Sequence, residues 1–264
     1  GLDRGVWEQY IIFMKSVFSF DFGYSIASQR LVSEMVAEGA FYSAMVLLPA
    51  LLIGSFMGLT AGLYGGTNKR KKPERILTSF SILMEALPSF LIAMLSLTVF
   101  SFHLRWFPLG HLASGGDPSI FDLIHHLTLP VGVLSSIVFS GYYLMVKNMV
   151  LQIHDEYFIH AKRALGFTEG HIKTRHVFRN VFTQFLSMFA LSLGGIISGS
   201  IIVEIVFSLN GMGSMLFSAI SFGDYPVIQG CFIFITLSVM ITNLIAEMLY
   251  GLIDPRVGEG VASA

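Results

Sequence analysis

The sequence predicts an all-α, polytopic membrane protein. Between Glu38 and Lys69 the chain runs for thirty residues without a charged side chain, and four further stretches of similar length carry few charges. About 20 apolar residues are enough to cross the hydrocarbon core as a helix. Lipid offers the backbone no hydrogen-bond partner, so spanning segments must be helices or strands of a closed barrel. The composition agrees, since 12% of the residues are charged, against roughly 25% in soluble proteins.

Five spanning helices are expected in this chain, and charged or polar residues mark their limits. The first begins after Glu38 and the second after Arg75. The third follows the polar stretch 103–126, and the fourth begins after Arg179. The fifth ends before Asp254. The predicted spans lie near residues 40–65, 76–102, 127–151, 181–206 and 226–251.

The basic residues gather on alternate connections. Cytoplasmic loops carry an excess of Lys and Arg. This pattern places the 65–76 connection, the 152–180 segment and the C-terminus in the cytosol. The segments 1–39, 103–126 and 207–225 then face outward. Twelve of the sixteen basic residues lie on the cytosolic side: Lys69, Arg70, Lys71, Lys72, Arg75, Lys147, Lys162, Arg163, Lys173, Arg175, Arg179 and Arg256.

The chain is thus expected to have two parts. Residues 1–39 form an external N-terminal segment, and residues 40–264 form a transmembrane domain with a cytoplasmic loop at 152–180. The external segment carries three basic residues and has to cross the membrane, although the sequence begins with no signal peptide pattern. We therefore expect a further spanning helix before residue 1, which gives six helices in the intact protein.

The 152–180 segment predicts two helices joined by a glycine. The first begins at Glu156 and runs through good helix formers to Gly166, which ends it because glycine tolerates positive φ. Thr168 then caps a second helix, whose first turn carries Glu169. Fixed at both ends to spanning helices, this segment would project a rigid lever into the cytosol. The alternative is an ordinary solvated basic loop.

The stretch EYFIHAKRALGFTEGHIKTRHVFRN resembles the cytoplasmic loop of B-type permease subunits of dipeptide, oligopeptide and nickel ABC importers. The matching residues are Ala164, Gly166, Glu169, Arg175, His176, Arg179 and Asn180. The resemblance covers nearly the whole chain through DFG (21–23), LPSF (87–90), Leu129-Pro130, VEIVFSLNGMG (203–213), GDYPVIQG (223–230) and Asp254-Pro255-Arg256. In that family the match to Gly1 falls just after the first membrane helix, which agrees with the inference from charge.

The sequence also departs from the pattern of that family. The family loop usually has small residues where His160 and Lys162 stand, and a proline where Gln184 stands. The family commonly shows Trp-Pro where this chain has Leu209-Asn210. Local geometry and substrate range are therefore expected to differ from those of typical members.

The resemblance implies the type I permease fold of ABC importers and a set of partners. These are a homologous C-type permease, two ATP-binding subunits, an extracytoplasmic substrate-binding protein and membrane lipid, with no nucleic acid. The chain contains no G-x-x-x-x-G-K-[ST] phosphate-binding loop. The chain itself is expected to hold no cofactor, metal or catalytic residue, and partner ATPases would bind ATP and Mg²⁺.

The resemblance also indicates which segment couples this chain to ATP hydrolysis by a partner. In the family the helix-glycine-helix loop docks into a groove of an ATPase subunit. Gly166 would form the turn, Ala161 the close-contact surface, and Arg175 a charged contact or a brace. The expected coupling residues are Glu156, Ala161, Ala164, Gly166, Glu169, Arg175, His176 and Arg179. Local helix structure alone is the alternative role for each of them.

Four glycines in the first span recur at intervals of four residues, which places them near one face of the helix and permits close approach of another backbone. They are Gly54, Gly58, Gly62 and Gly66. This surface could serve a contact within the bundle or the interface with the C-type permease.

Three acids lie within or at the edge of the apolar spans, where ionisable groups are functional candidates. Glu85 precedes Pro88 and could line the pathway where the helix is disrupted. Glu204 could line it too or brace the following segment, whose expected gate residues are Asn210 and Met212. Glu247 lies nearer the cytosolic end. The alternative for each acid is a carboxylate that braces the bundle or lies at the membrane interface.

The expected function is a permease subunit that passes short peptides inward across a bacterial cytoplasmic membrane. An importer of nickel or a metal chelate, for which the external His103 and His111 are the available ligands, is the first alternative. A stand-alone proton-coupled carrier that uses Glu85, Glu204 or Glu247 is an alternative from another class. A channel is disfavoured because no repeated polar filter is visible, and an enzyme is disfavoured because no catalytic motif occurs.

Overall fold

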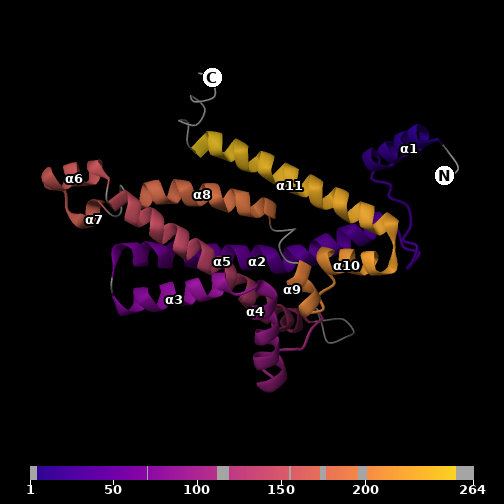
Figure 1. Ribbon diagram of the computed structural model, residues 1–264, viewed down its shortest axis with the longest axis horizontal. Coiled ribbons are helices and arrows are strands. Elements are labelled where there is room, and N and C mark those ends of the chain that lie inside the picture. Colours follow the sequence, from indigo (N-terminus) through magenta and orange to yellow (C-terminus); the bar gives the residue numbers. More distant parts are fainter. Residues whose placement is uncertain are drawn as a thin grey trace.

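The computed structural model describes residues 5–69, 71–111, 119–154, 156–172, 177–195 and 201–253, and within them the fold is all-α (Figure 1). This confirms the predicted fold class. The helices are α1 (Val6–Phe18), α2 (Val32–Thr67), α3 (Lys72–Ala86), α4 (Ser89–Ser96), the π-helix η1 (Leu97–His103), α5 (Ile120–His154), α6 (Tyr157–Ala164), α7 (Glu169–His171), α8 (Phe178–Gly195), α9 (Ile201–Val206), α10 (Met212–Phe222) and α11 (Tyr225–Ile253).

Helices α2, α5 and α11 are long and apolar enough to cross a membrane. Their most apolar windows have mean hydropathies of 2.0, 1.7 and 1.9, respectively. They contain the first, third and fifth predicted spans. Helices α2 and α5 begin several residues before those spans, because a helix continues into the more polar membrane interface whenever the flanking residues tolerate helix. The hydropathy of the sequence therefore locates these helices and leaves their ends open.

The second predicted span, 76–102, is divided in two. Helix α3 ends at Ala86, and the axis of the following helix, α4 with η1, is bent from it by 107°. Leu87 takes the extended conformation, with ψ of 137°. The cause is Pro88, which disfavours helical backbone at the preceding residue and donates no N–H to the ladder. This region is a broken span or a re-entrant segment.

The fourth predicted span, 181–206, corresponds to α8 and α9. Residues 196–200 between these helices lie outside the described residues. By length and composition, the described residues therefore contain three spanning helices and one bent pair.

Among the described residues, the most extensive helix contact joins α2 to α5 through the glycine face of α2. A Cβ atom added at Gly58 would lie 2.6 Å from the Cβ of Tyr142, and one added at Gly62 would lie 2.7 Å from the Cβ of Val146. All four glycines expected to form a close-contact surface face α5 in this way: Gly54, Gly58, Gly62 and Gly66. The surface thus serves a contact within this chain.

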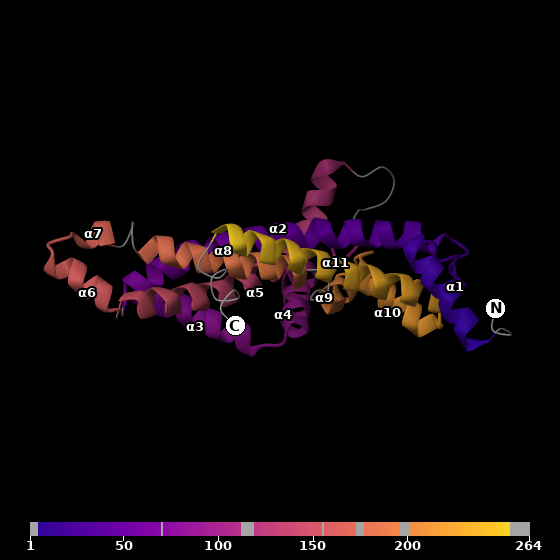
Figure 2. The same ribbon diagram turned by 90° about the horizontal axis from the view of Figure 1, so that it is seen from above.

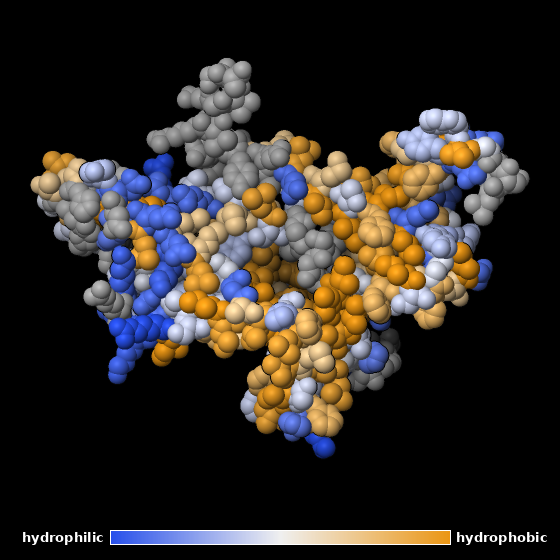
Figure 3. Space-filling view, viewed as in Figure 1, coloured by the Kyte–Doolittle hydropathy of each residue, from blue (hydrophilic) through white to orange (hydrophobic). Residues whose placement is uncertain are grey.

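The two ends of the molecule are separated by a long apolar middle. Helices α6 and α7 and the α2–α3 connection lie at one end, and α1 and α10 lie at the other (Figures 1 and 2). Hydrophilic residues gather at the α6–α7 end, and hydrophobic residues dominate the middle of the face shown in Figure 3. The two basic connections predicted to share one side of the membrane therefore share one end of the fold.

Three clusters of buried residues follow one another along the long axis. The first joins α5, α6 and α8 around Val150, Ile159 and Val181. The second joins α2, α4, α5 and α9, and it includes Phe207. The third joins the start of α2 to α10 and α11 around Met212. The elements at both ends of the molecule are thus packed onto the spanning helices.

Candidate translocation path and coupling segment

A cavity of about 600 Å³ lies between α2, α3, α5 and α8 and contains Glu85. Glu85 is close to the end of α3, which stops two residues before Pro88 because of the break described above. Pro88 itself is exposed and is the N-cap residue of α4. Gly141 lies beside this carboxylate in the cavity wall: a Cβ atom added there would lie 3.1 Å from Glu85 Oε1, so the glycine leaves room for the carboxylate. Leu, Ile, Val and Met side chains form most of the remaining wall.

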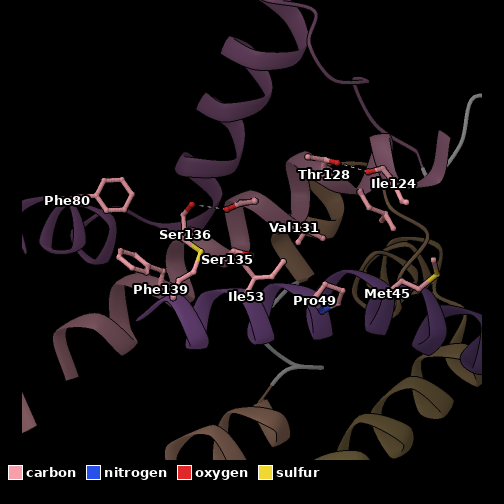
Figure 4. A pocket seen from close by; sticks show the side chains of 13 residues that line it. Met45, Pro49, Ile53, Phe80, Ile124, Thr128, Val131, Ser135, Ser136 and Phe139 are labelled. Carbon is pink, nitrogen blue, oxygen red and sulfur yellow. Dashed lines mark hydrogen bonds between the residues drawn. The ribbon is translucent and has the colours of Figure 1, made fainter. Parts of the chain in front are cut away.

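A second cavity, of about 670 Å³, lies between α2 and α5 (Figure 4). Two of its three hydroxyl groups are turned toward their own helix: Thr128 Oγ1 donates to the carbonyl of Ile124, and Ser136 Oγ donates to that of Gly132. Ser135 Oγ is buried and has no hydrogen-bond partner in the described part of the chain. Walls of this kind suit a lipid chain or another helix, whereas a charged solute needs polar partners.

Glu204 organises the hairpin formed by α9 and α10. Its side chain is buried, and Oε2 accepts hydrogen bonds from the backbone N–H groups of Gly213 (2.8 Å) and Ser214 (3.3 Å). Ser43 Oγ, on α2, donates to Glu204 Oε1 at 2.7 Å and accepts from the N–H of Met212 at 2.8 Å. A carboxylate at a helix N-terminus satisfies otherwise unpaired donors and complements the helix dipole. This geometry is that of a brace for α10, and Glu204 lines neither of the two cavities described above.

The turn between α9 and α10 fits tightly around this carboxylate. A Cβ atom at Gly211 would overlap the Glu204 carboxylate and lie 2.7 Å from Ser43 Oγ, so only glycine fits there. Asn210 is exposed at the tip of the turn, whereas Met212 is fully buried in the third cluster. Of these two expected gate residues, Asn210 is therefore accessible and Met212 is a packing residue.

Asp224 ties the N-terminal segment to the connection between α10 and α11. The carboxylate is buried and accepts hydrogen bonds from Ser25 Oγ at 2.6 Å and from the N–H groups of Ile26 and Ala27 at 3.1 and 3.2 Å. Burial alone would raise the pKa of Asp224, but these bonds and one from the N–H of Val227 outweigh it and lower the pKa below its ordinary value. The connection is thus held by an ionised carboxylate.

A largely buried ion pair lies near the α6–α7 end of α3 and α5. Lys147 Nζ lies 2.5 Å from Glu74 Oε1 and donates to Thr78 Oγ1 at 2.8 Å. Tyr143 OH lies 2.9 Å from the same threonine hydroxyl. A buried pair of this kind is satisfied only while both partners stay in place. It therefore fixes the start of α3 against α5.

The coupling segment forms an elbow at the end of the molecule. Helix α6 ends at Ala164, and Gly166 has φ of +84°, as the helix-glycine sequence predicts. Thr168 Oγ1 accepts a hydrogen bond of 3.4 Å from the N–H of His171, the last residue of the short α7. Ile159 and Ile172 are fully buried in the cluster that includes residues of α5 and α8. The elbow is therefore anchored on the spanning helices.

The other coupling residues differ in how far the structure describes them. Glu156, Ala161, Ala164 and Arg179 are exposed. Glu169 begins α7. Arg175 and His176 lie outside the described residues, as does the middle of the predicted second helix of the elbow, residues 173–176.

Three of the residues that organise these sites were not expected from the sequence: Ser43, Glu74 and Asp224. Asp224 occurs in the stretch GDYPVIQG, which the resemblance singled out without a role for this side chain. Glu74 lies in the first turn of α3, beside several basic residues, where a lone acid is a weak signal. Ser43 meets a partner 161 positions away in sequence, and no local pattern reveals such a contact.

Comparison with known proteins agrees with this architecture. Residues 50–259 match the family described as binding-protein-dependent transport system inner membrane component. An oligopeptide transport system permease protein of Bacillus subtilis is 29% identical over 97% of this chain and 82% of its own length. A glutathione transport system permease protein of Escherichia coli is 26% identical over 97% of this chain and 81% of its own length.

The fold also matches a solved structure. A chain of the MetNI methionine ABC transporter in an inward-facing conformation superposes with a TM-score of 0.66, at 13% sequence identity, over 83% of this chain and 96% of that chain. At this identity the likeness shows the fold, which is that of a type I ABC importer permease. With its apolar spanning helices and its match to the family over most of its length, this chain belongs to the binding-protein-dependent transport system inner membrane components, and it is a multi-pass inner-membrane transport component.

Proposed function

We propose that this chain is the transmembrane permease subunit of an ATP-driven importer that moves short peptides inward across the cytoplasmic membrane. It works with a homologous C-type permease, two ATP-binding subunits and an extracytoplasmic substrate-binding protein. The ATP-binding subunits bind ATP and Mg²⁺. The α6–α7 end and the C-terminus face the cytosol, and residues 1–39 face outward. The names of the Bacillus and Escherichia relatives support a peptide as the transported solute.

The observation that carries this proposal is the elbow formed by α6, Gly166 and α7. Its outer surface is free, since Ala161, Ala164 and Leu165 are exposed. Its inner surface is fixed, since Ile159 and Ile172 are fully buried. A segment with an exposed docking face and a rigid attachment can transmit a push from a partner. A solvated loop without such an attachment cannot.

The packing indicates how the push reaches the membrane. Ile159 and Ile172 belong to the same cluster as Val150 of α5 and Val181 of α8. The glycine contact binds α2 to α5, so α2 follows any movement of α5. Closure of the ATPase subunits would thus shift α2, α5 and α8 together and change access to the cavity that contains Glu85. This is a population shift between two packings.

The hairpin of α9 and α10 is proposed as the external gate. Glu204 and Ser43 hold its turn on α2, so the hairpin is coupled to the same rigid unit. Asn210, exposed at the tip, is the gate residue available to solute or to the binding protein.

The test is uptake of radiolabelled peptides by proteoliposomes that contain the complete importer and its binding protein. We expect uptake to require ATP and to persist when the proton gradient is collapsed. Gly166→Pro should abolish uptake and uncouple ATP hydrolysis while the complex still assembles, because proline cannot adopt φ of +84°. Gly170→Ala, in the same elbow with open space around it, is the matched control and should keep uptake. Uptake that needs only a proton gradient would refute the proposal in favour of a secondary carrier.

A further inference from the structure

Glu85 is an ionisable group without a partner. Its side chain is exposed to the cavity between α2, α3, α5 and α8, and it forms no hydrogen bond or ion pair with any described residue. The acids that are buried in the described part of the chain are all satisfied. Glu74 pairs with Lys147, Glu204 accepts from Ser43, and Asp224 accepts from the N-terminal segment.

The position of Glu85 within the membrane makes its lack of a partner significant. Helix α5 has 35 residues, which corresponds to about 52 Å at 1.5 Å per residue. Gly141, which faces Glu85 Oε1, is four residues from the centre of α5, or about 6 Å along its axis. The hydrocarbon core extends roughly 15 Å to each side of the bilayer centre. With the middle of α5 placed at the bilayer centre, the carboxylate lies at hydrocarbon depth, where an ionisable group faces a cavity or a partner of opposite charge.

The cavity wall limits what that partner can be. Apart from Glu85, its polar side chains are Tyr142 and Ser192, whose hydroxyl oxygens lie 2.7 Å apart. One carboxylate with two hydroxyls is a poor set for a transition metal, which prefers several imidazole, thiolate or carboxylate ligands. It is a sufficient set for an ammonium group, which needs one negative charge and neutral oxygen acceptors.

The size and the apolar lining of the cavity also fit a small solute that carries an ammonium group. A volume of about 600 Å³ falls within the range of roughly 300–1,000 Å³ typical of small-ligand sites. The Leu, Ile, Val and Met side chains offer contacts without directional demands, so they accept side chains of different shapes. One fixed charge in such a setting recognises the common part of a family of solutes.

We propose that Glu85 is the counter-charge for the N-terminal ammonium group of a peptide in transit and makes this cavity selective for solutes with a free amino group. This inference rests on the proposed import function and adds the chemical group that the pathway recognises. The binding protein still selects its cargo outside the membrane, and Glu85 acts on what has been released into the cavity.

The experiment uses the complete importer in proteoliposomes with its binding protein and a mixture of tripeptides with free amino termini. Internalised peptide is quantified by mass spectrometry, and ATP hydrolysis stimulated by the binding protein is measured on the same vesicles. Glu85→Gln should lower uptake about tenfold or more, the effect of losing one charge-assisted contact, while stimulated ATP hydrolysis is kept. Glu85→Asp should restore much of the uptake, and Glu34→Gln, at the exposed start of α2, should match the wild type.

A second measurement identifies the recognised group. The same tripeptides are acetylated at the N-terminus, and the ratio of free to acetylated peptide inside the vesicles is compared between variants. Glu85→Gln should lower this ratio, because acetylation removes the charge that Glu85 recognises. If the binding protein excludes acetylated peptides, the test of Glu85 is the first measurement alone: reduced uptake of free tripeptides by Glu85→Gln with stimulated ATP hydrolysis retained.

Each outcome separates this inference from the function on which it rests. A wild-type importer that takes up no tripeptide would refute the import of peptides. Wild-type uptake that Glu85→Gln leaves unchanged would overturn the role of Glu85 only. Equal loss of uptake and of ATP hydrolysis in Glu85→Gln would also overturn it, because it would show that Glu85 supports assembly or pairs with a cation of the second permease.

Discussion

Replacing Glu204 by glutamine should loosen the hairpin of α9 and α10 without removing any side-chain volume. The carboxylate accepts from two N–H groups at the start of α10 and from Ser43 Oγ. The glutamine amide has only one oxygen. Its NH₂ group must face either the helix N–H groups or a serine hydroxyl that already accepts from Met212.

The expected loss follows from these contacts. Hydrogen bonds to a charged acceptor contribute about 1.5–3 kcal/mol and neutral ones about 0.5–1.5 kcal/mol. The charge at the helix N-terminus adds about 0.3–1 kcal/mol. Replacing two charged bonds by weaker ones and losing the third should therefore destabilise the hairpin by at least about 2 kcal/mol. Glu204→Ala should cost more, because it leaves the buried N–H groups of Gly213 and Ser214 without an acceptor.

The assay is thermal unfolding of the purified complex, together with hydrogen exchange of the backbone amides in residues 209–216. We expect a lower unfolding temperature and faster exchange in this stretch for Glu204→Gln. Glu38→Gln, which removes an exposed ion pair with Arg30, is the matched control and should behave as the wild type because exposed pairs stabilise little. Unchanged hydrogen exchange at the start of α10 in Glu204→Gln would show that the carboxylate does not hold α10 in place.

Three further changes have defined outcomes. Gly62→Ala places a Cβ 2.7 Å from the Cβ of Val146 on α5 and should destabilise the subunit by about 1–3 kcal/mol. Gly132→Ala, at a position with open space around it, is the control and should leave the stability unchanged. Equal unfolding temperatures for the two variants would refute the close contact. Asp224 has a lowered pKa, so its stabilisation is present above the ordinary value of 3.8 and is lost as the pH falls through the lower folded value. Asp224→Asn should flatten that acid-side decline in thermal unfolding, and an unaltered pH profile would contradict this. Glu74→Gln leaves the largely buried Lys147 with a neutral partner and should lower the unfolding temperature. The double variant that also carries Lys147→Met should recover part of this loss, because it removes the unpaired charge. A double variant that recovers nothing would argue against the ion pair.

The spanning helices could be located from the sequence because hydropathy alone determines them. Helices α2, α5 and α11 contain predicted spans, and Gly166 takes the positive φ that its place after a helix predicts. These features depend on residues close together in the chain. The break at Pro88 has a local cause too, but the angle of 107° depends on what α4 packs against and could not be predicted.

The contacts that shape the candidate sites join distant parts of the chain. Glu204 meets Ser43 across 161 positions, and Asp224 meets Ser25 across 199. A single sequence indicates that Glu204 is an acid in an apolar setting without showing whether it faces a cavity or a helix N-terminus. The glycine spacing in α2 likewise indicated a close contact, and the structure was needed to identify α5 as the partner.

The most direct test of the central claim, that an ATPase grips the elbow, is photo-crosslinking from Ala161 in the complete importer. A photoreactive amino acid placed at this exposed position should capture an ATP-binding subunit, and the yield should change when ATP is added. The same probe at Ile220, exposed on α10 at the opposite end of the molecule, should not capture that subunit. An elbow that crosslinks to no ATP-binding subunit in an importer active in peptide uptake would contradict the account.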